Sequence, residues 1–102
     1  MNPAVGQAIE IVRLKVSPEN VTKFLEGRMK VDEFVHTIAG HIGTELVQLS
    51  EDTWLMIIRW RDKESVLAAQ KITEQATVIS DWLGSTSQFV SFENATVGYV
   101  SK

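Results

Sequence analysis

The 102-residue chain has no cysteine, two histidines, two prolines and no long apolar run. The absence of cysteine excludes disulfides, thiolate nucleophiles and cysteine-bound zinc or iron–sulfur sites. The two histidines, His36 and His41, do not have the spacing of a common metal motif, so we expect no metal site. The glycine-rich motifs that bind nucleotide phosphates are also missing. The sequence therefore predicts no cofactor.

Charge and hydropathy bear on the possible partners. The formal net charge is −3 and no stripe of Lys and Arg is present, so nucleic acid is not an expected partner. The longest apolar stretch, Trp54–Ile58, is far shorter than the roughly 20 residues that a membrane span needs. Residues 1–7 lack the basic start and apolar core of a signal peptide. We therefore expect no membrane contact and a cytoplasmic location.

The composition is typical of a folded globular protein, with 44% apolar and 23% charged residues. No segment has the character of a linker, a repeat or a low-complexity tract. The sequence predicts a single domain over residues 1–102, with a core from about residue 8 to residue 100.

Hydrophobic periodicity predicts elements in the order strand, helix, strand, strand, helix, short helix, strand. The predicted strands are 8–16, 41–49 and 53–61, with a final strand or strand pair over 88–92 and 96–100 that is broken at 93–95. The predicted helices are 18–38, 63–73 and 76–83, with Ser17 and Asp62 as N-caps and a bend at Gly27. This order is the α+β, ferredoxin-like split βαβ arrangement with an antiparallel sheet.

Both faces of this predicted sheet are apolar. The strand at 53–61 places Trp54, Met56, Ile58 and Trp60 on one face and Leu55 and Ile57 on the other. One layer of helices covers only one face of a sheet. We therefore expect a homodimer that packs through the sheet face and forms a dimeric α/β barrel.

The step from the third strand to the second helix, Ile58–Val66, has a Trp at the strand end, then a charged turn and a helix. In this segment, in its element order and in its length, the chain resembles the antibiotic-biosynthesis-monooxygenase-like (ABM) domain of the dimeric α/β-barrel superfamily. The resemblance covers about residues 8–99. The resemblance implies a chemistry that some members of the family carry out, in which oxygen is used without metal or flavin. In these members an acidic phenol or anthrone becomes a carbanion that reacts with oxygen. Other members degrade haem, and many have no known activity.

The chain departs from the pattern of these domains at two places. ABM domains often carry a His in the second helix, nine or ten residues after the strand-end Trp, where this chain has Ala69 and Gln70. Haem-degrading relatives use an Asn in the first strand and a ligand His in later helices. Here the strand position is Val12, and no His follows His41.

The function that the resemblance implies is an ABM-like oxidoreductase, in the form of a cofactor-independent monooxygenase that acts on a small aromatic or quinol compound. The first alternative is a non-catalytic small-ligand-binding or regulatory protein with the same fold. Haem binding ranks below both.

Two tryptophans are candidates for substrate binding. Trp60 and Trp82 would line a pocket and stack on a flat ring, or they would serve as core aromatic residues. The core interpretation is favoured for both, because Trp60 would anchor its strand to the helices and Trp82 fits the amphipathic packing of a short helix.

Two residues are candidates for the catalytic base. Glu10 would be a partly buried proton acceptor if its strand face meets the helices, and a solvated carboxylate if it lies at the strand end. His36 follows Arg28 and Asp32 in an i, i+4, i+8 series, and a carboxylate beside it would favour a general-base role. The pattern favours a solvated, salt-linked helix face for this series.

Overall fold

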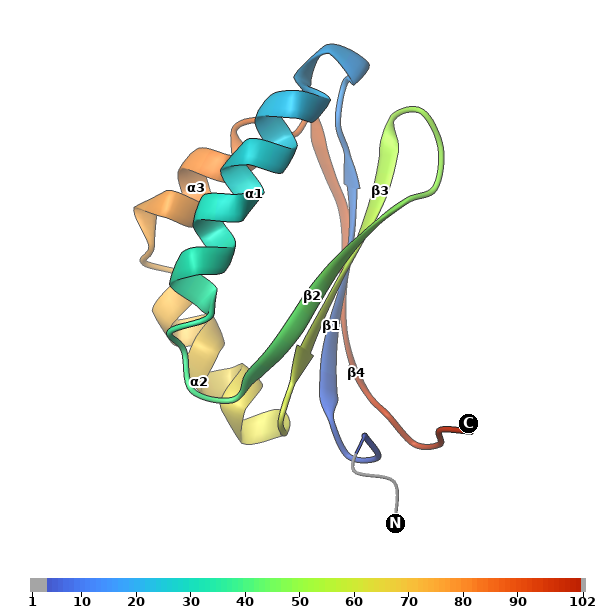
Figure 1. The fold of residues 1–102 in the computed structure, drawn as a ribbon, viewed down its shortest axis with the longest axis vertical. Coiled ribbons are helices and arrows are strands. Elements are labelled where there is room, and N and C mark those ends of the chain that lie inside the picture. The colour runs from blue at the N-terminus through green and yellow to red at the C-terminus, as the bar shows by residue number, and fades with distance from the viewer. Residues whose placement is uncertain (1–3, 102) are drawn as a thin grey trace.

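The computed structural model describes residues 4–101, in which an antiparallel sheet has helices on one face (Figure 1). The four strands have the order β2-β3-β1-β4. The elements are β1 (Ala8–Lys15), the 3-10 helix η1 (Pro18–Asn20), α1 (Val21–Val35), β2 (His41–Gln48), β3 (Thr53–Trp60), α2 (Lys63–Thr73), α3 (Thr77–Leu83) and β4 (Gln88–Thr96). This architecture confirms the predicted α+β, ferredoxin-like fold.

The final strand differs from the prediction. β4 runs without interruption through residues 93–95, which pair with residues 9–11 of β1, so the predicted break is wrong. The polar pair Glu93 and Asn94 suggested a turn, but β4 is an edge strand, where polar side chains are tolerated on both faces. The register shift in this ladder lies earlier, between Arg13 and Leu14 of β1.

The helix caps follow the prediction in one case and not in the other. Asp62 caps α2, because its Oδ1 accepts a hydrogen bond from the Ser65 backbone N–H at 2.8 Å. Ser17 makes no side-chain cap. The chain instead forms η1, in which the Asn20 N–H donates to the Ser17 carbonyl at 2.8 Å, and α1 begins one residue later.

Gly27 lets α3 approach α1 closely. α1 continues through Gly27 as one helix. A Cβ atom at this position would lie 2.9 Å from Cδ1 of Trp82, which is closer than real Cβ contacts. Trp82 is fixed there because its Nε1 donates to the Phe24 carbonyl at 2.9 Å and its ring stacks on Phe24 with centroids 5.2 Å apart.

The core lies between the helices and the sheet face that they cover. Its largest fully buried side chains are Trp60, Phe24, Leu14, Val12, Val16 and Val31. The opposite face of the sheet is uncovered and carries partly exposed aliphatic residues, Ile9, Ile11, Leu55 and Ile57. On that open face Arg59 Nε and Glu45 Oε1 lie 3.4 Å apart. The helices therefore leave an apolar sheet surface without a partner.

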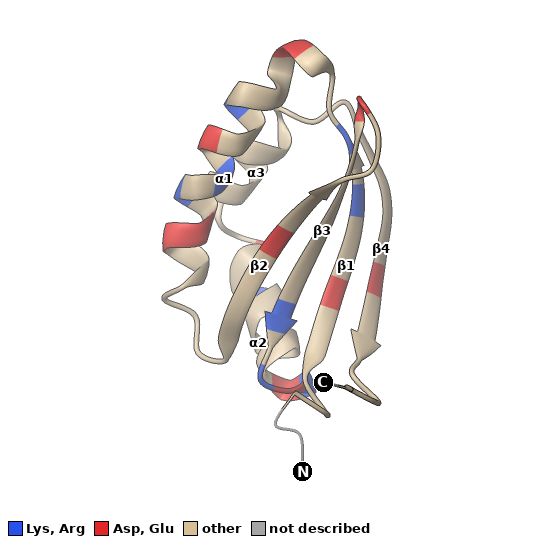
Figure 2. Cartoon of the chain, turned by 45° about the vertical axis from the view of Figure 1, so that its right-hand side comes forward, with Lys and Arg blue, Asp and Glu red and all other residues tan. Residues whose placement is uncertain are grey.

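Charged residues of both signs are interspersed along α1 and over the strands (Figure 2). In residues 4–101 no helix is long and apolar enough to cross a membrane.

The close contact at Gly27 predicts the effect of a single methyl group. In a helix interior, Ala is more favourable than Gly by about 1 kcal/mol. Overpacking a well-packed core typically costs about 1–3 kcal/mol, and Trp82 is held from two sides. We expect Gly27→Ala to lower the free energy of unfolding, measured by urea denaturation, whereas Lys30→Ala on the exposed side of α1 should not. A stabilised Gly27→Ala protein would contradict this packing.

Candidate functional site

A cavity of about 130 Å³ lies between the covered face of the sheet and the helices. Its apolar walls include Val12, Met56, Ile58, Trp60, Trp82 and Phe92. Two charged residues also line it, Glu10 from β1 and Arg28 from α1. An apolar cavity with a few polar groups is the usual form of a small-molecule site.

Glu10 is buried at 7% exposure, and two donors hold its carboxylate. Trp60 Nε1 donates to Oε1 at 2.7 Å, and Gln70 Nε2 donates to Oε2 at 3.2 Å. Each carboxylate oxygen has two lone pairs, so each keeps one site that can accept a proton. Of the two environments considered for Glu10, the structure shows the buried one.

Gln70 was not recognised from the sequence as a site residue. It lies on α2 and its amide also donates to Oδ1 of Asn94 on β4 at 3.3 Å. This position is one of the two at which ABM domains often carry a histidine. That departure was the available signal, but it does not reveal that the amide reaches the Glu10 carboxylate.

Arg28 is 4% exposed, so the predicted solvated helix face is wrong for this residue. Its Nε bonds to Asp32 Oδ1 at 2.8 Å and its Nη1 donates to the Met56 sulfur at 3.1 Å. The guanidinium carbon lies 4.9 Å from the ring centre of Trp82. Its Nη2 is buried and has no hydrogen-bond partner among the described residues.

Burial lowers the pKa of Arg28 from its ordinary value, because the charged guanidinium loses water. Asp32 opposes this effect through its charge and its hydrogen bond, and the charge of Glu10 also opposes it. The guanidinium stays protonated in proteins. The cavity therefore contains a fixed positive charge and a carboxylate.

The structure brings three of the four predicted site residues, Glu10, Trp60 and Trp82, around one cavity. His36 lies elsewhere, exposed at the C-cap of α1. Its ring contacts that of His41 at a centroid distance of 4.9 Å, and His41 contacts Trp60 at 5.2 Å. His36 therefore reaches the cavity wall only through His41.

His41 is a half-buried histidine whose pKa lies below its ordinary value of 6.5. Burial is the main cause, and the positive charges of His36 and Arg28 add to it, while Asp32 acts in the opposite direction. The ring nitrogen Nε2 is 3.0 Å from Oγ1 of Thr44.

The lowered pKa of His41 predicts lower stability in acid. Below pH 6.5 the unfolded chain binds a proton at this position before the folded chain does, so stability falls as the pH falls. We expect the urea midpoint to drop between about pH 7.5 and pH 5.5, at fixed protein concentration, less in His41→Gln than in wild type. His36→Gln should keep most of the drop, because burial is the larger cause. An equal drop in wild type and His41→Gln would contradict the assignment.

A groove of about 400 Å³ adjoins the cavity near β4. Glu10 and Phe92 line both spaces, whereas Gln70 and Ser80 line the groove alone. The cavity-lining Phe92 is half exposed. Glu10 therefore lines both the cavity and the groove that α2, α3 and β4 form beside it.

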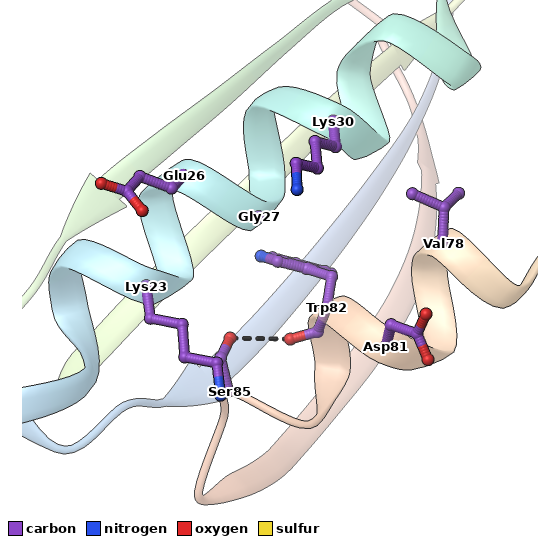
Figure 3. A pocket seen from close by; sticks show the side chains of 8 residues that line it. All are labelled: Lys23, Glu26, Gly27, Lys30, Val78, Asp81, Trp82 and Ser85. Carbon is purple, nitrogen blue, oxygen red and sulfur yellow. Dashed lines mark hydrogen bonds between the residues drawn. The ribbon is translucent and has the colours of Figure 1, made fainter.

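A separate hollow, of about 310 Å³, lies between α1 and α3 (Figure 3). Lys23, Glu26, Lys30 and Asp81 at its edges are exposed side chains. Trp82 is the one residue that it shares with the inner cavity. Its charged groups already contact water, so this hollow has no buried polar group that needs a ligand. Within residues 4–101 no cluster of three or more His, Asp or Glu residues forms a metal site.

Known proteins share the fold of this chain, and one sequence family matches it. Solved structures with this fold include a conserved protein from Methanosarcina mazei Go1, at 13% identity over 93% of this chain and 96% of that chain, with a TM-score of 0.79. A dimeric ferredoxin-like protein from an uncultured marine organism has 16% identity over 99% and 94% of the two chains, with a TM-score of 0.67.

A further similar structure is SnoaB, a cofactor-independent oxygenase from Streptomyces nogalater, at 12% identity over 96% of this chain and 97% of that chain, with a TM-score of 0.65. The sequence model described as antibiotic biosynthesis monooxygenase (ABM) matches residues 8–79. The chain belongs to the ABM family. No sequence among the curated proteins matches it.

Proposed function

We propose that this ABM protein is an oxidoreductase, a cofactor-independent monooxygenase that acts on a small aromatic or quinol compound. The observation that carries the proposal is the cavity between the sheet and the helices, in which the buried Glu10 lies among apolar and aromatic walls. Such a site removes a bound ring from water and offers it one proton acceptor.

In the proposed reaction Glu10 is the base. A C–H or O–H bond of the substrate breaks, the proton moves to a free lone pair of the carboxylate, and the electron pair stays on the ring system. The resulting carbanion reacts with molecular oxygen. For a ring methylene, one oxygen atom ends as a carbonyl and the other leaves as water with the two hydrogens. Trp60 and Trp82 supply the walls on which the flat ring packs.

Trp60 and Gln70 are positioning residues for this base. Their hydrogen bonds fix both carboxylate oxygens of Glu10 from β3 and α2. A held carboxylate keeps its free lone pairs in a constant direction, which general-base catalysis requires. His36 stays a candidate base from the sequence, and its exposed position makes it the weaker one.

Haem does not fit this cavity. Its volume of about 130 Å³ is close to that of an engineered cavity of about 150 Å³ that binds benzene. A porphyrin joins four pyrrole rings and is far larger. Within the described chain no histidine lines the cavity to bind iron.

The base assignment predicts a specific loss of turnover. Glu10→Gln keeps the size of the side chain and removes the proton acceptor, so we expect turnover to fall by roughly 10²–10⁴. The measurement is oxygen consumption by chelator-treated protein with a panel of quinols and anthrones. Glu33→Gln, an exposed change on α1, is the matched control and should retain full activity.

The same assay compares the two candidate bases. His36→Gln should stay close to wild type if Glu10 is the base, and full activity of Glu10→Gln on any turned-over substrate would refute the assignment. If no compound in the panel is oxidised faster than without protein, the non-catalytic ligand-binding alternative is favoured.

We also propose that two copies pack through the open sheet face, and that the protein resides in the cytoplasm. The dimer is supported by the aliphatic residues that the helices leave uncovered, Ile9, Ile11, Leu55 and Ile57. The marine ferredoxin-like protein of the same fold is itself dimeric. In a twofold dimer each face meets an identical face, so one apolar surface covers the other.

The proposed dimer predicts that stability depends on protein concentration. When folding and association are coupled, the unfolding midpoint rises with concentration. We expect Ile57→Lys, on the open face, to give monomers by sedimentation or to unfold. Met29→Lys, at an exposed position of α1, should stay dimeric. A wild-type monomer at micromolar concentration, equally stable on dilution, would contradict the dimer.

A further inference from the structure

We propose that Arg28 binds the oxygen of a single-ring phenol or quinol in the inner cavity and stabilises the oxyanion that forms when Glu10 takes the proton. The inference rests on the proposed function and deepens it, because it names the substrate class and the residue that recognises it.

One hydrogen-bond donor of Arg28 is left unsatisfied by the described residues. Arg28 lines the cavity and is 4% exposed, and its Nη2 has no hydrogen-bond partner in the described chain. A buried charged donor without an acceptor is costly, so such groups call for a specific explanation. Trp54 Nε1 is the other buried donor of this kind, but it is neutral and does not line the cavity. Arg28 thus offers a ligand a charged donor inside an apolar space.

The charges around the cavity favour a ligand that enters in its neutral form. Asp32 already bonds to Arg28 Nε, and Glu10 adds a carboxylate to the same cavity. A ligand that enters as an anion would add a further negative charge beside two carboxylates, of which that of Glu10 is buried. A neutral phenol avoids this. Its O–H bond breaks inside the site, the proton passes to Glu10, and the electron pair stays on the oxygen, so the net charge of the cavity does not change.

The positive charge of the Arg28 guanidinium is held in a fixed position. A fixed guanidinium costs no reorganisation when charge develops on the bound oxygen, and low dielectric strengthens their attraction. The contacts of Nε with Asp32, of Nη1 with Met56 and of the guanidinium plane with Trp82 hold Arg28 before a ligand arrives. Arg28 therefore lowers the free energy of the phenolate relative to the phenol in this cavity.

The size of the inner cavity limits the size of the ligand. The inner cavity, at about 130 Å³, has room for about one aromatic ring, as judged from the benzene-binding cavity of about 150 Å³. The adjoining groove of about 400 Å³ shares five lining residues with the cavity, namely Glu10, Thr73, Ile79, Leu83 and Phe92. A ring substituent can extend into this groove, and a fused three-ring compound has to occupy both spaces.

The test is a binding experiment that needs no turnover. Para-nitrophenol and its methyl ether, para-nitroanisole, are titrated into wild type and Arg28→Met, and the pH at which bound para-nitrophenol becomes yellow is recorded. Because hydrogen bonds to charged groups are strong, we expect Arg28→Met to weaken binding of the phenol by roughly 10- to 100-fold and leave that of the ether unchanged. The ionisation midpoint of the bound phenol should move to higher pH.

Two further variants keep the test decisive. Arg28→Lys retains a positive donor and should recover part of the preference for phenol over ether, and it also carries the comparison if Arg28→Met does not fold. Arg61→Met removes an exposed arginine, with a side chain 69% accessible, and should change nothing. Equal loss for phenol and ether, no loss in either Arg28 variant, or no saturable binding of para-nitrophenol to wild type would overturn the inference.

The outcome is separable from that of the oxygenase proposal. Phenol-specific binding through Arg28 without oxygen consumption would refute catalysis and leave the binding inference in place. Turnover that is as fast in Arg28→Met as in wild type would refute the role of Arg28 and leave the oxygenase proposal in place.

Discussion

Two opposite charges, enclosed between one face of the sheet and its helices, impose the constraint on which this structure depends. A charge removed from water needs polar partners, and Glu10 and Arg28 find them on different elements. Glu10 joins β1 to Trp60 on β3 and Gln70 on α2. Arg28 joins α1 to β3 through Met56 and lies over the ring of Trp82 on α3. The contacts of the two charged side chains thus also position the elements around the cavity.

Stability alone does not account for Arg28. Replacing both partners of a buried ion pair by apolar groups of similar volume is often neutral or stabilising, so a folded core does not require the pair of Arg28 and Asp32. The unpartnered Nη2 adds a penalty that a folded core does not require. Gly27 is different, because the close approach of Trp82 requires it for packing alone. Residues that disfavour folding locally are expected where a protein binds or reacts.

The sequence predicted one half of the site and missed the other, for a physical reason. In a strand, side chains alternate with period two, so alternation placed Glu10 on one face of β1 with Val12 and Leu14, and Trp60 on one face of β3 with Met56 and Ile58. The sequence left open whether the face with Glu10 meets the helices, and the structure shows that it does. Helical spacing grouped Arg28 with Asp32 and His36 as one polar stripe. The structure divides this stripe, because the long arginine stem packs inward while His36 stays exposed. The contact of Gln70 with Glu10 depends on how α2 docks, which no local pattern encodes.

The two spaces differ in which of the two charged residues lines them. Glu10 lines both the groove and the inner cavity, whereas Arg28 lines only the inner one. In the proposed binding mode, a ring that enters through the groove meets Phe92 and the carboxylate before its leading atom reaches the guanidinium. Its oxygen must lead, because a leading apolar group would leave the charged donor buried and unpaired. The order of the two charges along the path, base first and cation last, thus selects which end of the substrate is bound deepest.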